Sequence, residues 1–173
     1  MTIRKLSLRP LTQAAFAPFG DVIEAAGEPS YLINNGHTER FHALALAQTC
    51  TASDTQDEVN VGISIFRNQQ ALTDPVSIHL LERHPLGSQA FIPLAGQAFM
   101  IVVAKPFNEN QPDENEIYAF LSNGKQGVNY HTGVWHHPLI TLEAPSDFLV
   151  IDRIGSGHNC DIYHLNQPML IVR

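Results

Sequence analysis

The chain has few cysteines, and their placement excludes two kinds of site. Its two cysteines, Cys50 and Cys160, lie far apart and form no Cys-x-x-Cys pair. This spacing excludes a zinc knuckle and a dithiol redox motif. We expect both to be reduced thiols, buried as small apolar side chains, as in most cytosolic proteins.

Positive charge and long apolar runs are also scarce. Ten Lys and Arg against seventeen Asp and Glu give a net charge of −7. This argues against nucleic acid or an anionic membrane as the main partner, because both attract clustered positive charge. The longest apolar run, residues 99–104, is far too short to cross a bilayer. Residues 1–11 have no apolar core of signal-peptide length, so we expect a soluble, cytoplasmic protein.

The composition that remains is typical of one globular domain. Hydrophobic residues make up 44% of the 173 and charged residues 16%, so we expect residues 1–173 to fold as a single domain. Short apolar segments separated by turn residues predict about ten strands. The expected strands include residues 3–8, 60–67, 75–84, 91–94, 98–104, 134–142, 148–154, 161–165 and 169–172.

Little helix is expected beside these strands. Thr12 can cap a short helix through about residue 16, and residues 105–115, which are polar and carry two prolines, predict a surface loop. Many short strands with so little helix are typical of an all-β antiparallel barrel or jelly roll. Such barrels enclose cavities in which small ligands bind.

Two polar stretches fall on these apolar strands and point to a site. In residues 82–96, Glu82 and His84 are two apart, so their side chains leave one face of a strand. They could act as an acid/base pair or as metal ligands, or they could be a surface pair at a strand end. Gln89 follows a tight turn, where its amide could bond local backbone or contact a substrate.

The second stretch, residues 127–138, carries three histidines beside the only Trp. His136 and His137 face opposite sides of a strand, so only one of them is expected to enter a shared pocket. We count Tyr130 and His131, which lie in the same stretch, among the substrate-binding candidates. Trp135 is expected to pack in a core or an interface.

An anion-binding arginine is the remaining candidate feature. Arg67 continues the strand face that carries the apolar residues of 60–67, so its guanidinium could reach the mouth of a cavity. It could equally be a solvated strand end. Arg40, Arg83 and Arg153 are alternatives that the sequence does not rank.

The spacing of these residues resembles the two motifs of the cupin superfamily. His84, Gln89 and Gly96 keep the spacing of the first motif, with Glu82 where its first His stands and Gln89 where its Glu stands. In the second motif Gly133 and His136 match, with His131 in place of a proline. His84 and His136 therefore stand at metal-ligand positions.

Longer strings resemble one cupin family, the ureidoglycolate lyases. They are Arg40-Phe41-His42, Leu81-Glu82-Arg83-His84-Pro85-Leu86-Gly87-Ser88-Gln89-Ala90-Phe91-Ile92-Pro93, Gly127-Val128-Asn129-Tyr130, Gly133-Val134-Trp135-His136-His137-Pro138-Leu139 and Asp152-Arg153. The likeness extends from about residue 3 to residue 172. It implies a double-stranded β-helix barrel, a homodimer and a divalent metal such as nickel.

The resemblance also implies an activity in purine and allantoin breakdown. The expected reaction is cleavage of (S)-ureidoglycolate to glyoxylate and urea, by acid/base elimination at the hemiaminal carbon. Glu82, His84 and His136 would be catalytic, with Gln89 and Arg67 binding the substrate. Two other interpretations stay open: a metal-dependent cupin dioxygenase or isomerase acting on another small polar substrate, and a non-catalytic metabolite-binding module.

Overall fold

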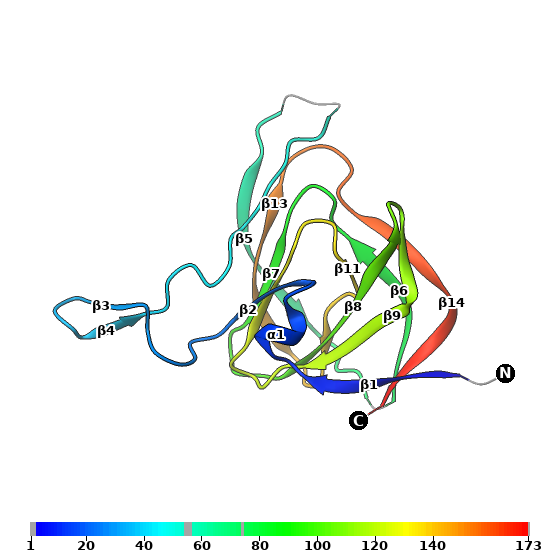
Figure 1. The fold of residues 1–173 in the computed structure, drawn as a ribbon, viewed down its shortest axis with the longest axis horizontal. Helices are drawn as coiled ribbons and strands as arrows, with labels where there is room; N and C mark the ends of the chain where they lie inside the picture. Colours follow the sequence, from blue (N-terminus) through cyan, green and yellow to red (C-terminus); the bar gives the residue numbers. More distant parts are fainter. Residues whose placement is uncertain (1–2, 54–56, 74, 173) are drawn as a thin grey trace.

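The structure, a computed structural model, describes residues 3–53, 57–73 and 75–172. These residues form β-strands and one four-residue helix, α1 (Gln13–Phe16), which confirms the all-β prediction (Figure 1). The strands are β1 (Arg4–Pro10), β2 (Gly20–Ile23), β3 (Tyr31–Ile33), β4 (Thr38–Arg40), β5 (Asn60–Asn68), β6 (Val76–Arg83), β7 (Gln89–Pro93), β8 (Phe99–Asn108), β9 (Gln111–Leu121), β10 (Gly127–Tyr130), β11 (Trp135–His136), β12 (Ile140–Thr141), β13 (Ser146–Ile154) and β14 (Asp161–Val172).

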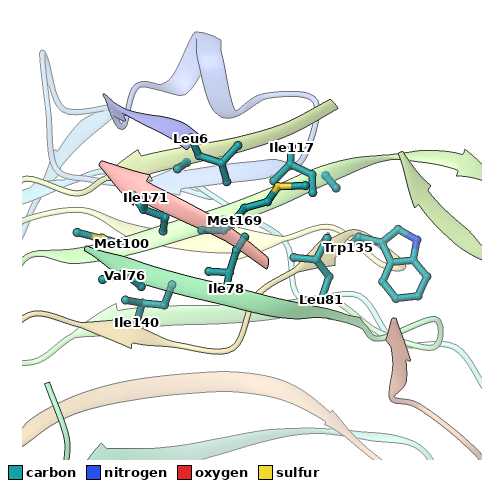
Figure 2. Packing of buried hydrophobic residues seen from close by; sticks show 13 residues of the cluster. Leu6, Val76, Ile78, Leu81, Met100, Ile117, Trp135, Ile140, Met169 and Ile171 are labelled. Atoms are coloured by element: carbon teal, nitrogen blue, oxygen red, sulfur yellow. The ribbon is translucent and has the colours of Figure 1, made fainter. Parts of the chain in front are cut away.

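Six of these strands close into a barrel. In ring order they are β6, β14, β1, β9, β8 and β11, and the ring closes because β11 pairs with both β8 and β6. Apolar side chains from all six strands pack together in one core, as Figure 2 shows. Trp135 belongs to this core and is 2% exposed, which agrees with its expected packing role.

A five-stranded antiparallel sheet, in the order β2-β10-β7-β13-β5, packs against one side of this barrel. A second core lies between them, with Phe99 and Ile101 of β8 facing Phe148 and Val150 of β13. Strand β8 is therefore buried on both faces, because its alternate residues enter the barrel core. Burial on both faces explains why residues 99–104 are continuously apolar instead of alternating. The two layers agree with the predicted cupin-like barrel.

The helix predicted near Thr12 is present. The Thr12 hydroxyl accepts a hydrogen bond from the Ala15 backbone N–H at 3.3 Å, which satisfies one free donor at the helix N-terminus. Phe16 is fully buried and meets Phe120 edge to face, with ring centroids 5.8 Å apart. The helix therefore packs onto the second core.

Residues 105–115 do not form the predicted surface loop. Strands β8 and β9 continue through this region and leave only a two-residue turn at 109–110. The two prolines lie opposite each other, Pro106 against Pro112, where the register shifts. Because a bulge tolerates a residue without an N–H, the hairpin accommodates both prolines.

Two other strand predictions differ from the structure in their continuity. Residues 134–142 form two short strands, β11 and β12, instead of one. Residues 161–165 and 169–172 belong to the single strand β14, whose pairing with β6 shifts register between His164 and Met169.

The alternation predicted in residues 60–67 is correct, but its apolar face points outward. Val61, Ile63 and Ile65 are 46%, 74% and 55% exposed. The neighbours of Ile63 and Ile65 on β13, Ile151 and Leu149, are only partly covered. The exterior of the five-stranded sheet is therefore apolar at its β5 edge.

A hairpin of β3 and β4 extends away from the barrel (Figure 1). Its hydrogen bonds join hairpin residues to one another, as from the Ser30 N–H to the Arg40 carbonyl at 2.9 Å. The Arg40 guanidinium lies 5.4 Å from the centroid of the Tyr31 ring. Tyr31 and Leu32 remain 42% and 57% exposed, so this segment also presents apolar surface.

Both cysteines are free, as predicted, but they are exposed where we expected burial. Both lie in segments between strands, which leaves their thiols outside the two cores. Among the described residues, no helix has the length and apolar character needed to span a membrane.

Candidate active site

A cavity of about 460 Å³ opens between the barrel and the five-stranded sheet. Both layers contribute to its wall. The lining residues are Phe66, Arg67, Asn68, Glu82, His84, Gln89, Phe91, Pro138 and Leu139. Four of the residues singled out in the sequence, at 67, 82, 84 and 89, therefore meet at one site.

Strand register places the key side chains in two rows. On the five-stranded sheet, Asp152, Gln89 and Tyr130 are directly paired across β13, β7 and β10. On the barrel, Glu82 of β6 is paired with His136 of β11. Directly paired residues share a face of a sheet, so the side chains of each row point to the same side of their sheet.

The two imidazoles present the same ring nitrogen to the site. His84 Nδ1 donates to the Asn159 carbonyl at 2.6 Å, and His136 Nδ1 donates to the Val134 carbonyl at 2.9 Å. A carbonyl oxygen only accepts, so in each neutral ring the proton is on Nδ1 and the lone pair is on Nε2. Both Nε2 atoms are buried without a hydrogen-bond partner.

His136 is held neutral by its surroundings. It is 2% exposed, and burial lowers its pKa to about 3, with a smaller lowering from the nearby His84. Its ring stacks on Tyr130 at 4.1 Å between centroids and 10° between planes. Its Nε2 lies 3.7 Å from Glu82 Oε1, a contact that is not an ion pair because the ring is uncharged.

Glu82 has the opposite tendency. Burial raises the pKa of its carboxyl group, and the nearby His84 opposes part of this rise. A carboxyl group with a raised pKa can hold a proton nearer to neutral pH than an exposed glutamate can. The site therefore pairs an imidazole that resists protonation with a carboxyl group that favours it.

These three side chains could also hold a metal ion. One ligand atom from each of Glu82, His84 and His136 lies within 4.8 Å of the others. Two imidazole lone pairs and a carboxylate suit a divalent transition metal, and the two unpartnered Nε2 atoms are the atoms that would bind it. The residues present therefore fit the metal that the sequence resemblance implies, with Glu82, His84 and His136 as its ligands.

Arg67 lies at the cavity wall but already has a partner. Its guanidinium forms a two-point contact with the Asp147 carboxylate, with both N···O distances 2.7 Å. This contact raises the pKa of Arg67 and lowers that of Asp147. The Arg67 side chain is 59% exposed and continues the outward face of β5 that carries Ile63 and Ile65.

The other predicted arginines do not line this cavity. Arg83 bonds the Asp161 carboxylate at 2.7 Å, and Arg153 donates to the Cys50 carbonyl at 2.9 Å. Arg40 lies on the projecting hairpin. His131 lies apart from the cavity lining, with its Nε2 3.3 Å from Asp21 Oδ2.

Sequence reasoning missed two residues that orient this site. Asn159 fixes the ring of His84 through its backbone carbonyl, and Asp152 bonds the side chain of Gln89. Asp152 belongs to the family-like string Asp152-Arg153, which by itself indicates no role, and a backbone carbonyl leaves no signal in a residue pattern. Tyr130 was predicted, but its stacking on His136 could not be.

A β-barrel in which two imidazoles and a carboxyl group converge on a cavity defines an enzyme-like centre of the cupin type. The family model described as ureidoglycolate lyase matches residues 3–172. The chain therefore belongs to the ureidoglycolate lyase family, as the sequence motifs indicated.

Curated relatives share this name over nearly the full length of the chain. A ureidoglycolate lyase of Pseudomonas syringae pv. syringae is 55% identical over 170 residues, which cover 98% of this chain and 95% of the relative. One from Pseudomonas putida is 52% identical, with 98% and 97% covered. One from Pseudomonas aeruginosa is 56% identical over 159 residues, with 92% and 89% covered.

Proposed function

We propose that this protein is a lyase that cleaves (S)-ureidoglycolate to glyoxylate and urea, in the breakdown of purines through allantoin. The observation that carries the proposal is the cluster of Glu82, His84 and His136, of which Glu82 and His84 line the cavity, in a chain that belongs to this family. A C–N elimination of this kind needs a proton acceptor and a proton donor on either side of one carbon.

The reaction follows from the hemiaminal carbon of the substrate. That carbon carries a hydroxyl, a carboxylate and a urea nitrogen. Loss of the hydroxyl proton allows a C=O bond to form as the C–N bond breaks, and the departing nitrogen takes up a proton to give urea. Each well-placed proton transfer contributes about 10²–10⁴ in rate.

The geometry favours a division of these roles. His84 Nε2, which has a free lone pair, would accept the hydroxyl proton. The Glu82 carboxyl group, whose pKa is raised, would deliver a proton to the departing nitrogen. His136 resists protonation, so it would orient the substrate or bind a metal but not act as the acid.

When a divalent cation is bound, Glu82, His84 and His136 would be its ligands and the cation would polarise a substrate oxygen as a Lewis acid, so the proton-transfer roles above are those of the metal-free site. The sequence resemblance implies nickel for this place. Arg67, at the mouth, would bind the substrate carboxylate by exchanging Asp147 for it. Tyr130 would hold the His136 ring in place, and Gln89 would contact the ureido group.

The test is to incubate the protein with each ureidoglycolate enantiomer, before and after metal removal, and to follow urea. Only the S enantiomer should yield urea, and His84→Ala or His136→Ala should remove most of the activity. His79→Ala is the matched control, because His79 is exposed on the same strand as Glu82. Near-normal turnover in both site variants would exclude this assignment.

Two other results would also overturn the proposal. Stoichiometric iron or manganese together with consumption of oxygen would indicate a cupin dioxygenase. Tight binding of ureidoglycolate or glyoxylate without turnover would indicate a binding module.

We further propose that the protein is a homodimer that works in the cytoplasm. The outward apolar residues of β5 and the exposed side chains of the β3–β4 hairpin support self-association, because apolar surface of this kind is usually covered. A second copy of the chain would cover the apolar residues of β5 and those of the hairpin. The two free cysteines are typical of a reducing compartment.

A further inference from the structure

The side-chain amide of Gln89 has one end bonded and one end free. Its Nε2 donates to Asp152 Oδ2 at 3.1 Å. Its Oε1 is buried and has no hydrogen-bond partner, although Gln89 lines the cavity and is only 8% exposed. A buried acceptor without a partner costs free energy, so it is a feature that needs a reason.

Asp152 determines which end of the amide is free. An ionised carboxylate only accepts hydrogen bonds, so it selects the NH₂ end of the Gln89 amide. The reversed amide would set two acceptor oxygens against each other and would turn the NH₂ group toward the cavity. Direct pairing of Asp152 with Gln89 across β13 and β7 keeps the two side chains adjacent.

The cavity wall is consequently rich in acceptors. Gln89 Oε1 and His84 Nε2, from two lining residues, are buried acceptor atoms without partners, and His136 Nε2 is a third beside Glu82. The two ends of ureidoglycolate differ in this respect, because its ureido group carries three N–H donors while its carboxylate only accepts. The ureido end therefore suits the Gln89 side of the cavity, and the carboxylate end suits the Arg67 side.

We propose that Asp152 is a positioning residue that holds the Gln89 amide oxygen toward the cavity, where it accepts a hydrogen bond from the terminal NH₂ of the ureido group. The site thereby selects ureido compounds over analogues that lack the terminal NH₂. This inference rests on the proposed function for its substrate class. Sites built to hydrogen-bond a polar substrate group discriminate strongly against analogues without it, because a buried group is then left unpaired.

The inference can be tested by binding alone, with two compounds that cannot react. N-carbamoylglycine carries the terminal NH₂, and N-acetylglycine carries a methyl group in its place. Both lack the hydroxyl needed for elimination. The dissociation constants of both compounds are measured by calorimetry for the wild type, Asp152→Asn and Asp161→Asn. Asp161 is the matched control, because it bonds Arg83 and does not line this cavity.

The wild type and Asp161→Asn should bind N-carbamoylglycine at least tenfold more tightly than N-acetylglycine. In Asp152→Asn the new amide can donate to Gln89 Oε1, so the Gln89 amide can reverse and the preference should fall to about threefold or less. Binding of N-acetylglycine should change little. In turnover, KM for ureidoglycolate should rise more than kcat falls.

Three results would overturn the inference. The preference could survive unchanged in Asp152→Asn, or both compounds could weaken equally, which would make Asp152 merely structural. Loss of bound metal from Asp152→Asn, measured by elemental analysis, would mean that the Gln89 oxygen serves a metal. Failure of the wild type to release urea, with the binding preference intact, would instead reject the proposed function and leave this inference standing.

Discussion

At the scale of single residues, backbone carbonyls decide the chemistry of this site. The Asn159 and Val134 carbonyls accept the Nδ1 protons of His84 and His136, which leaves both Nε2 lone pairs free in the cluster with Glu82. The identities of Glu82, His84 and His136 could be predicted, because motif spacing depends on neighbours in sequence. Their tautomers could not, because the carbonyl that fixes His84 lies seventy-five residues away.

Burial of His136 should make the metal-free protein less stable in acid. The pKa of His136 is about 3 in the folded state against 6.5 for the free side chain. Its contribution to stability is therefore complete above pH 6.5, and it is lost as the pH falls from 6.5 toward 3, because only the unfolded chain takes up the proton. The loss is about 1.4 kcal/mol per pH unit, or roughly 2 kcal/mol by pH 5.

This loss can be measured by guanidinium unfolding at pH 7 and pH 5, monitored by the fluorescence of Trp135. The comparison is with His136→Asn, whose amide can still donate to the Val134 carbonyl. Glu82 is present in both proteins, so its contribution to the pH dependence cancels. The difference between the two proteins in the loss of unfolding free energy from pH 7 to pH 5 therefore reports on His136. Equal pH dependence in the two proteins would contradict the neutral, buried ring.

At the scale of strands, apolar patterning predicted where strands lie, but not which face points inward or where prolines are accommodated within a strand. The run at residues 99–104 was predicted as a strand and serves two cores. Residues 105–115 were misassigned, because opposed prolines at a bulge look like a loop in sequence. The outward apolar face of β5 could not be predicted either, since alternation gives two faces but not which of them points inward.

The pairing of β2 with β10 depends on Gly20. A Cβ at this position would lie 2.0 Å from the Asn129 carbonyl oxygen, which is backbone and cannot rotate away. Gly20→Ala should therefore push β2 from β10 beside Tyr130 and cost about 1–3 kcal/mol, as overpacking does elsewhere. Gly155→Ala is a milder control, because its nearest neighbour is the end of the Arg153 side chain at 3.0 Å.

The measurement is again guanidinium unfolding, together with urea release. Gly20→Ala should lose stability and also activity, because Tyr130 supports the His136 ring. If Gly20→Ala were as stable as Gly155→Ala, β2 and β10 could move apart without a loss of unfolding free energy, which would contradict this prediction.

At the scale of the whole molecule, the fold leaves apolar surface on its outside. The apolar residues at 61, 63 and 65 on the outer face of β5, and those at 31 and 32 on the projecting hairpin, are each at least 42% exposed, and the hairpin extends away from the barrel (Figure 1). A lone two-stranded hairpin is marginal in water, and exposed apolar patches commonly mark interfaces. From the sequence, a dimer was implied only by the family resemblance. The contacts between two copies depend on which strand faces point outward, and the sequence does not show this.

The intact protein should therefore scatter light as a particle of about twice the 19.1 kDa of one chain. The double variant Ile63→Glu and Ile65→Glu should shift it to the monomer, because four buried charges per dimer cannot be paired across like surfaces. Phe107→Glu, at a 70% exposed position on β8, is the control and should remain dimeric. A monomeric wild type would disprove the dimer.

Metal binding should also act on the whole molecule, because a ligand that binds only the folded state raises its stability. At a concentration of one hundred times Kd, nickel should add about 2.7 kcal/mol, which for a chain of this length raises Tm by roughly 5–10 °C. The variants His84→Ala and His136→Ala should show little rise, since each removes one of the two unpartnered Nε2 atoms. Thermal scans at fixed protein concentration, with magnesium as the control for an oxygen-preferring ion, separate this effect from dimer formation. An equal rise in Tm in the wild type and both variants would show that nickel binds elsewhere. Glu82 and His84 would then act in this site by proton transfer, without a metal.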